Sequence, residues 1–149
     1  MMHTTQPERP AASKARVFCA DDNPLVTAAL QRYVERSPDF DWMGCAEDAD
    51  ELCSEVRSRG CPDIVLLDID MPGMDPFAAI GELQRCCGRS RILMYSGMVR
   101  RDLIDRALEA GAWGYVSKGD GEQSLFEAMR AALAGHLALS PEVRAVYGS

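Results

Sequence analysis

The stretch that decides the fold is PDIVLLDIDMPGMDPF, residues 62–77. Residues 64–67 form a continuous apolar run, which is typical of a parallel strand that is covered on both faces. The run ends on a carboxylate, Asp68, and a second carboxylate follows at Asp70. A helical pattern then begins at Asp75–Pro76. A buried strand, an acidic loop and a helix together indicate one βα unit of a parallel sheet.

Working outward, the same alternation of short apolar runs and amphipathic stretches recurs along the chain. Strands are predicted at residues 16–20, 41–47, 63–69, 90–96 and 113–117. Helices are predicted at residues 23–37 and 48–60, from 75 onward, at 100–111, and from about 120 to about 135. Asn23 is a plausible N-cap with Pro24 at the first helical position, and Asp120 and Gln123 have capping-box spacing.

Five βα units predict an α/β fold, a doubly wound parallel sheet with helices on both faces. The chain has 149 residues, which suggests one domain. We expect a disordered tail over residues 1–14, the domain over 15–134, and a C-terminal linker or tail over 135–149.

Composition excludes several classes of protein. The net charge of −7 argues against a nucleic-acid surface, and nothing approaches the roughly 20 apolar residues of a membrane span. The N-terminus has no apolar segment of the kind found in secretory signals. The six cysteines form no CxxC pattern, and Cys86 and Cys87 are adjacent. We expect all six to be reduced thiols in a cytoplasmic protein.

Polar side chains follow the predicted strands at the points where they end. Asp21 and Asp22 follow the first strand, Asp68 ends the third, Ser96 ends the fourth and Lys118 follows the fifth. Ligands of such sheets bind beyond the carboxyl ends of the strands. Carboxylates about 4 Å apart repel by roughly 4 kcal/mol per pair at an effective dielectric of 20. Such a cluster therefore calls for a cation, and oxygen ligands suit Mg²⁺ or Mn²⁺.

A carboxylate beside a divalent ion, a lysine and a hydroxyl group suits attack on phosphorus. Asp68 is the central acid, which makes it the candidate nucleophile. Lys118 would stabilise charge on the phosphoryl oxygens, and Ser96 would donate a hydrogen bond to one of them. An Asp that follows a strand is also often a simple turn former, so the hypothesis rests on the order of these groups along the chain.

These residues resemble the receiver domain of two-component response regulators, over roughly residues 16–134. The resemblance rests on FCADDNP (18–24), DIVLLDIDMPGMD (63–75), MYSG (94–97) and GAWGYVSK (111–118). GAWGYVSK and the later GHLALSPEV (135–143) look most like the NarL/LuxR-type subfamily. The resemblance implies a flavodoxin-like, chemotaxis-response-regulator-like fold of five strands in the order 2-1-3-4-5.

The resemblance also implies a role for each site residue. Asp68 would accept a phosphoryl group from a phosphohistidine on a sensor histidine kinase. Asp22, Asp68 and the backbone carbonyl of Asp70 would hold Mg²⁺ directly, with Asp21 acting through water. Ser96 and Lys118 would contact the phosphoryl oxygens. Tyr115 matches the aromatic switch residue, whose alternative role is that of a core tyrosine.

The resemblance further implies that phosphorylation biases a surface made by helix four, strand five and helix five. The usual result would be homodimerisation or partner docking. Such a domain is a signalling module and not an enzyme, since it catalyses only its own phosphotransfer and dephosphorylation. Because the chain stops soon after LSPEV, where an output helix-turn-helix would follow, we expect no DNA binding by this chain and no membrane partner.

Three departures from the family pattern matter, and the third concerns two positions. Gly119 stands where a proline usually follows the lysine, which affects the local loop geometry. Pro76 stands where glycine is common, at the start of the third helix. Asp70 and Met98 occupy positions that vary among receivers and tune the lifetime of the phosphoryl group.

Three alternatives stay open. A pseudo-receiver would be an interaction module that never takes phosphate. A phosphatase of the haloacid dehalogenase type shares the VLLDID pattern of residues 65–70, although that family carries it on the first strand. A flavodoxin-like cofactor binder would need a phosphate cradle, and the first loop is DDNP, residues 21–24.

Overall fold

The structure, a computed structural model, describes residues 13–148. Its strands are β1 (Ala15–Ala20), β2 (Phe40–Ala46), β3 (Ile64–Leu67), β4 (Arg91–Ser96), β5 (Gly114–Ser117) and β6 (Ala138–Leu139). Its helices are α1 (Pro24–Arg36), α2 (Ala49–Arg59), α3 (Pro76–Cys86), α4 (Arg101–Ala110), the 3₁₀ turn η1 (Lys118–Asp120), α5 (Gly121–Leu133) and α6 (Pro141–Tyr147). The disordered tail predicted over residues 1–14 lies outside the described residues except for residues 13 and 14.

All strand pairs are parallel, and within residues 13–148 the sheet has the order β2-β1-β3-β4-β5-β6. The predicted order 2-1-3-4-5 is therefore confirmed. The prediction of a five-stranded sheet is corrected by β6, a two-residue strand that pairs with β5 through Gly114 and Tyr115.

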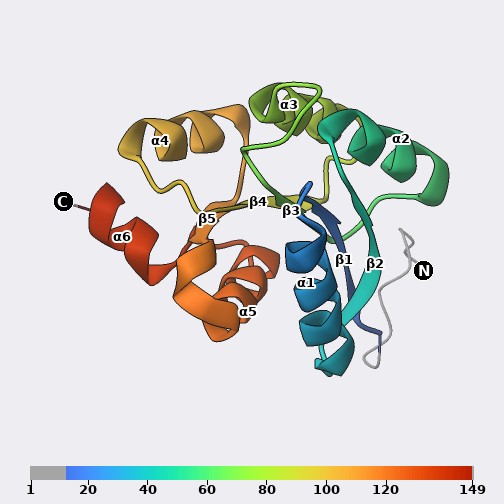
Figure 1. The fold of residues 1–149 in the computed structure, drawn as a ribbon, viewed down its shortest axis with the longest axis horizontal. Coiled ribbons are helices and arrows are strands. Elements are labelled where there is room, and N and C mark those ends of the chain that lie inside the picture. The colour runs from blue at the N-terminus through green and yellow to red at the C-terminus, as the bar shows by residue number, and fades with distance from the viewer. Residues whose placement is uncertain (1–12, 149) are drawn as a thin grey trace, which may run out of the picture.

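The helices cover both faces of the sheet, as Figure 1 shows. One core cluster joins one face of the strands to α1 and α5, and the other joins the opposite face to α2, α3, α4 and α6. Alternate residues of a strand serve the two clusters: Val65 and Leu67 lie in one, and Ile64 and Leu66 in the other. This explains why β3 reads as a continuous apolar run.

The predicted helix starts have mixed outcomes. Asn23 caps α1, because its side-chain oxygen accepts the Leu25 backbone N–H at 3.0 Å, and Pro24 is the first helical residue. The predicted capping box at Asp120 is wrong. A carboxylate oxygen of Asp120 instead accepts the backbone N–H of Glu142 at 2.9 Å, a contact from a segment far along the chain.

The segment after α5 is part of the packed structure, whereas the sequence suggested a linker or tail there. β6 extends the sheet, and α6 lies beside α4 and β5 at one end of the molecule (Figure 1). Val143 of α6 is fully buried in the core cluster that includes Tyr115. Gly114 allows the close approach of β6, since a Cβ there would lie 2.0 Å from the carbonyl oxygen of Ala138.

Two of the six cysteines do not fit the expectation of reduced thiols. Cys61 and Cys87 form a disulfide, with their Cα atoms 5.5 Å apart, while Cys86 remains a free, exposed thiol. The pair is 26 residues apart in sequence, and it meets because α3 returns the chain to the edge of the sheet at which β3 begins. One argument for a cytoplasmic location therefore no longer holds. None of the described helices is long and apolar enough to cross a membrane.

Candidate functional site

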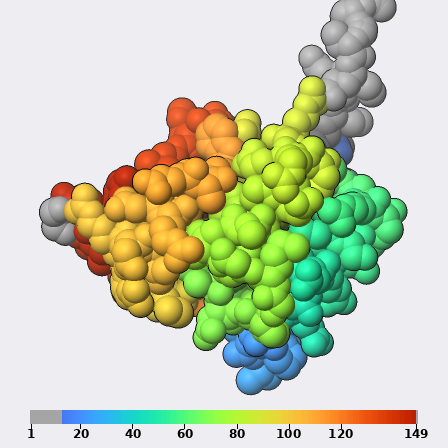
Figure 2. Space-filling view, turned by 90° about the horizontal axis from the view of Figure 1, so that it is seen from above, coloured from blue at the N-terminus to red at the C-terminus, as the bar shows by residue number. Residues whose placement is uncertain are grey.

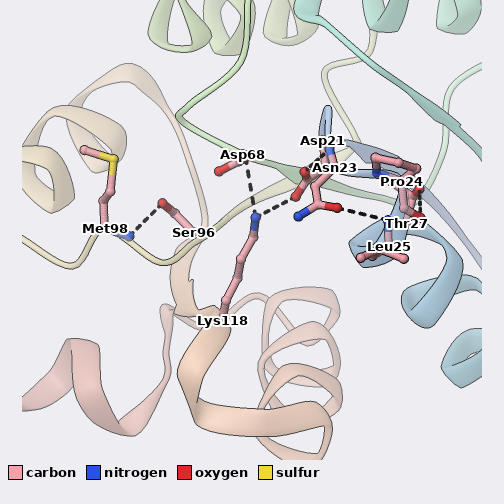
Figure 3. Close-up of polar contacts among 9 residues, drawn as sticks. All are labelled: Asp21, Asn23, Pro24, Leu25, Thr27, Asp68, Ser96, Met98 and Lys118. Atoms are coloured by element: carbon pink, nitrogen blue, oxygen red, sulfur yellow. Dashed lines mark hydrogen bonds and ion pairs between the residues drawn. The ribbon is translucent and has the colours of Figure 1, made fainter.

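The predicted site residues meet at the carboxyl edge of the sheet (Figure 3). Asp21 directly follows β1, Asp68 directly follows β3, and Lys118 directly follows β5. Ser96 is the last residue of β4. Because these strands are neighbours and parallel, their carboxyl ends lie together, and the four side chains converge from four different elements.

An acidic cluster forms the centre of the site. Asp21, Asp22 and Asp68 each offer a carboxylate oxygen, and these oxygens lie within 4.8 Å of one another. Asp21 and Asp68 are buried, with exposed fractions of 2% and 5%, whereas Asp22 is exposed. The cluster is thus buried on one side and open to solvent on the other.

The donor set fits a small divalent cation. One oxygen of Asp21, Oδ1, accepts the backbone N–H of Asn23 at 2.9 Å. The other, Oδ2, is buried and lies 2.7 Å from the Lys118 ammonium, but among the described residues it has no well-directed hydrogen bond. A buried carboxylate oxygen left in this way, beside two further carboxylates, suits Mg²⁺ or Mn²⁺.

Lys118 is the cation that the protein itself supplies. Its ammonium nitrogen lies 2.7 Å from Asp21 Oδ2 and 3.5 Å from Asp68 Oδ2 (Figure 3). Burial acts to lower the pKa of Lys118, but the close contact with Asp21 and the negative charges of Asp68 and Asp21 outweigh the effect of burial, and the pKa is raised. Lys118 is therefore charged at neutral pH and holds the two buried carboxylates together.

Asp68 has a raised pKa. Burial is the largest cause, Lys118 opposes it, and the charge of Asp21 adds to it. The backbone N–H of Asp70 also donates a hydrogen bond to Asp68, which favours the charged form. The Asp70 side chain is exposed. The ligand role of its carbonyl group and the lifetime roles of Asp70 and Met98 stay predictions.

Ser96 and Tyr115 are linked through the backbone of Met98. The Met98 N–H donates to Ser96 Oγ at 3.0 Å, and the Tyr115 hydroxyl donates to the Met98 carbonyl. Tyr115 is fully buried and so lies inward. Burial raises the pKa of Tyr115 to about 12. The side chain of Met98 is 39% exposed, at the rim of the site.

Three residues near the site were missed by the sequence analysis. Ser117 directly precedes Lys118, and its backbone N–H donates to Ser140 Oγ at 2.9 Å. The Ser117 hydroxyl donates to a carboxylate oxygen of Glu142. A signal was present, because Ser140-Pro141-Glu142 has the N-cap, first-turn proline and early acid of a helix start.

Comparison with known proteins places these observations in a family. The chain matches the response regulator receiver domain family over residues 17–130. It is 29% identical to the nitrate/nitrite response regulator NarL of Escherichia coli K12 over 126 residues, which is 85% of this chain and 58% of NarL. It is 30% identical to the transcriptional regulatory protein LiaR of Bacillus subtilis over 131 residues, 86% of this chain and 60% of LiaR.

A solved structure shows the same relationship. The chain superposes on a two-component response regulator of the LuxR family from Aurantimonas sp. SI85-9A1 with a TM-score of 0.84 and 34% identity. The match covers 91% of this chain and 96% of that one. A protein-glutamate methylesterase/protein-glutamine glutaminase of Maricaulis maris is 35% identical over 111 residues, which are 27% of that enzyme.

The comparisons overturn the exclusion of DNA as a partner. The relatives include transcriptional regulatory proteins, and the structurally similar RcsB has been solved as dimers bound to DNA. The chain spans about three fifths of the length of the curated relatives that it matches first, 61% and 58%. The prediction was wrong because net charge and the end of the given sequence describe only the part of such a protein that this chain covers.

The acidic cluster, the lysine that bridges it, the strand order and these matches agree with one another. The chain belongs to the receiver domain family of two-component response regulators, and it is of the NarL/LuxR type.

Proposed function

We propose that this chain is a phosphoacceptor receiver, in which Asp68 takes a phosphoryl group from a phosphohistidine of a sensor histidine kinase. The observation that carries the proposal is the shared position of three carboxylates and one ammonium group. Asp21 and Asp68 lie 2.7 and 3.5 Å from Lys118, and Asp22 completes the acidic cluster on the open side. A core with no reaction to perform would avoid this concentration of buried like charge.

The chemistry is an in-line displacement at phosphorus. A carboxylate oxygen of Asp68 forms the new O–P bond, the N–P bond of the phosphohistidine breaks, and the leaving imidazole takes up a proton. Lys118 neutralises charge on the transferred group, and the Ser96 hydroxyl donates a hydrogen bond to it. Asp68 must be ionised to attack, and Lys118 favours its ionised form.

Asp21, Asp22, Asp68 and the carbonyl group of Asp70 would hold Mg²⁺ or Mn²⁺. When bound, the ion would offset carboxylate repulsion and stabilise the charge on the phosphoryl oxygens. The contribution of the protein is to hold these oxygens together before the ion arrives, by attaching them to the ends of β1 and β3.

Phosphorylation would then act on the surface formed by α4, β5 and α5. The phosphoryl group adds about −1.5 to −2 charges at pH 7. That charge would draw Ser96 away from the Met98 N–H and alter the environment of Tyr115, whose hydroxyl shares the Met98 backbone. Dimerisation or docking of a partner on this surface would be the readout, and the chain would act as a signalling domain without a separate substrate.

The test is the intact mass after incubation with acetyl phosphate, with Mg²⁺ or with EDTA. We expect the wild type to gain the mass of one phosphoryl group only with Mg²⁺, and Asp68→Asn to gain none. Asp75→Asn changes a carboxylate in the same loop, at the N-cap position directly before α3, where it makes no side-chain cap hydrogen bond. It is the matched control and should be modified normally. A folded wild type that gains no mass from acetyl phosphate or from a panel of phosphorylated kinases would identify a pseudo-receiver. Continuous release of phosphate from phosphomonoesters would instead identify a phosphatase.

A further inference from the structure

The turn that carries Lys118 is tied to the far C-terminal segment. On its N-terminal side, the backbone N–H of Ser117 donates to Ser140 Oγ at 2.9 Å, and both serines are buried. The Ser117 hydroxyl donates to Glu142 Oε1. On the other side of the turn, Asp120 Oδ2 accepts the backbone N–H of Glu142 at 2.9 Å. Glu142 therefore contacts both ends of a turn whose first residue is Lys118.

The turn has little rigidity of its own. Its second residue is Gly119, which stands where the family commonly has proline, and glycine loses more conformational freedom than any other residue when it is fixed. Inside the turn, the Gly119 N–H donates to Ser117 Oγ at 3.1 Å. That hydroxyl is itself held by Glu142. The order of the turn thus depends on the C-terminal segment.

The C-terminal segment is firmly seated. The Ser140 N–H donates to the Tyr115 carbonyl at 3.2 Å, and Val143 is fully buried. Arg101 of α4 lies over the ring of Tyr147, 5.4 Å from its centroid. Figures 1 and 2 both show α6, in dark red, against α4, in yellow. The segment therefore covers part of the surface of α4 and β5 that switching is expected to change.

From these contacts we propose that residues 138–147, here called the C-terminal clamp, position Lys118, with Glu142 as the positioning residue. The clamp restricts the backbone of the turn at Gly119, as a rigid residue at that position would. The same hydrogen bonds would transmit a displacement of Lys118 to the end of α6. Glu142 touches no reacting atom and acts through Ser117 and Asp120. The positioning of Lys118 by the clamp does not depend on the proposed phosphorylation. The transmission of a displacement to α6, the functional half of the inference, rests on it.

The positioning half is tested without phosphate, by amide hydrogen exchange of residues 117–120. In Glu142→Ala we expect exchange there to rise on the order of tenfold, the effect of losing a hydrogen bond to a charged group. Glu142→Gln keeps an accepting oxygen but makes a neutral bond about half as strong, so exchange there should rise by only about threefold. Arg144→Ala is the matched control, because Arg144 lies on α6 but bonds the Leu139 carbonyl and not the turn. Unchanged exchange in Glu142→Ala would overturn the clamp.

The functional half is tested by two rates measured on the same variants. Glu142→Ala should slow phosphorylation of Asp68 by acetyl phosphate on the order of tenfold. Mg²⁺ affinity should change much less than the rate, since the clamp reaches Asp21 and Asp68 only through Lys118. Glu142→Gln, which keeps a neutral acceptor for the Ser117 hydroxyl, should restore part of the rate. An equal loss of rate and Mg²⁺ affinity would show general damage and overturn a positioning role.

The coupling is reciprocal, so phosphorylation must in turn alter the clamp. We expect exchange of residues 138–147 to change by about threefold or more in phosphorylated wild type, and less in Glu142→Ala, where the bond between the Ser117 hydroxyl and the Glu142 side chain is lost. No change in the phosphorylated wild type would overturn the coupling. If the wild type takes no phosphate at all, the proposed function fails, and the exchange of residues 117–120 still decides the clamp.

Discussion

At the scale of the residue, the site is a problem of buried charge. Asp21 and Asp68 are both buried, and they share the ammonium group of Lys118. Two buried carboxylates with one cation carry excess negative charge, which explains the raised pKa of Asp68. The change in stability on removing one of these charges should therefore depend on whether that charge is positive or negative.

We expect Lys118→Met, which keeps length but removes charge, to lower the free energy of unfolding by about 1 to 3 kcal/mol in metal-free buffer. The reason is that two buried carboxylates lose their cation, and the estimate is reduced because the Lys118 side chain is 25% exposed. Urea denaturation measures it. Lys14→Met removes an exposed partner of Asp41 and should change stability by less than about 0.5 kcal/mol. Equal effects of the two variants would contradict the prediction.

The raised pKa of Tyr115 predicts that the folded protein loses stability at alkaline pH. Its pKa is about 12 in the folded protein, against about 10 for an ordinary tyrosine. The folded state therefore keeps a proton that the unfolded state releases, so this contribution is complete below pH 10 and is lost as the pH rises to 12. The expected loss is roughly 2 to 3 kcal/mol.

Denaturation of wild type and Tyr115→Phe between pH 8 and pH 12 isolates this contribution, because the lysines and the other tyrosines are common to both proteins. The stability difference between them should shrink across the window from about pH 10 to about pH 12. A difference that is constant with pH would mean that the Tyr115 hydroxyl is not protected by burial and by the Met98 carbonyl.

At the scale of the element, two long-range connections join segments that a simple series of βα units would not bring together. β6 pairs with β5, which requires the absence of a side chain at Gly114. The disulfide of Cys61 and Cys87 joins the segment before β3 to the end of α3. The first connection is to β5, the strand that Lys118 follows, and the second adjoins β3, the strand that Asp68 follows.

We expect Gly114→Ala to displace β6, because the new Cβ would meet the Ala138 carbonyl oxygen at 2.0 Å. Both atoms belong to backbone-fixed positions, so neither gives way easily. Amide exchange of residues 138–147 should rise on the order of tenfold or more, the effect of losing about 1.4 kcal/mol or more of local stability. Gly81→Ala is the control, since a Cβ there meets nothing within 4 Å, and exchange of 138–147 should be unaffected.

Reduction of the disulfide should lower the free energy of unfolding by about 3 to 4 kcal/mol, since the closed loop spans 26 residues and restricts the unfolded chain. Urea denaturation with and without dithiothreitol measures the difference. Cys87→Ala should be insensitive to reductant, while Cys86→Ser, which alters a free thiol, should respond as the wild type does. Identical curves for oxidised and reduced wild type would show that the pair does not restrain the fold.

At the scale of the whole molecule, the acidic cluster predicts that binding of a divalent cation stabilises the folded state. Oxygen ligands from β1 and β3 come together only in the folded chain. An ion that binds the folded state alone stabilises it by about 2.7 kcal/mol at one hundred times its dissociation constant.

We therefore expect Mg²⁺ to raise the unfolding midpoint in a concentration-dependent way. Asp22→Asn should reduce this gain with little effect in metal-free buffer, because Asp22 is exposed. Asp41→Asn, which removes an exposed carboxylate on β2, serves as the control and should keep the full gain. A Mg²⁺ effect of the same size in all three proteins would indicate a general salt effect and no site.

Most of the fold and the centre of the site follow from local patterns. The apolar run of residues 64–67, the amphipathic helices and the cap at Asn23 are readable without tertiary contacts, since period and capping chemistry are local. The capping box at Asp120 failed for the opposite reason. Its carboxylate has a better donor in the backbone of Glu142, which no local pattern reveals.

The sequence by itself determined that Asp21, Asp68, Ser96 and Lys118 would converge, because the carboxyl ends of neighbouring parallel strands share one edge of a sheet. Only the tertiary structure decided that Cys61 meets Cys87 and that the C-terminal clamp returns to the Lys118 turn. Those contacts join residues more than 20 positions apart, and they depend on where each helix returns the chain. That position is set by the packing of the whole core and not by any local sequence.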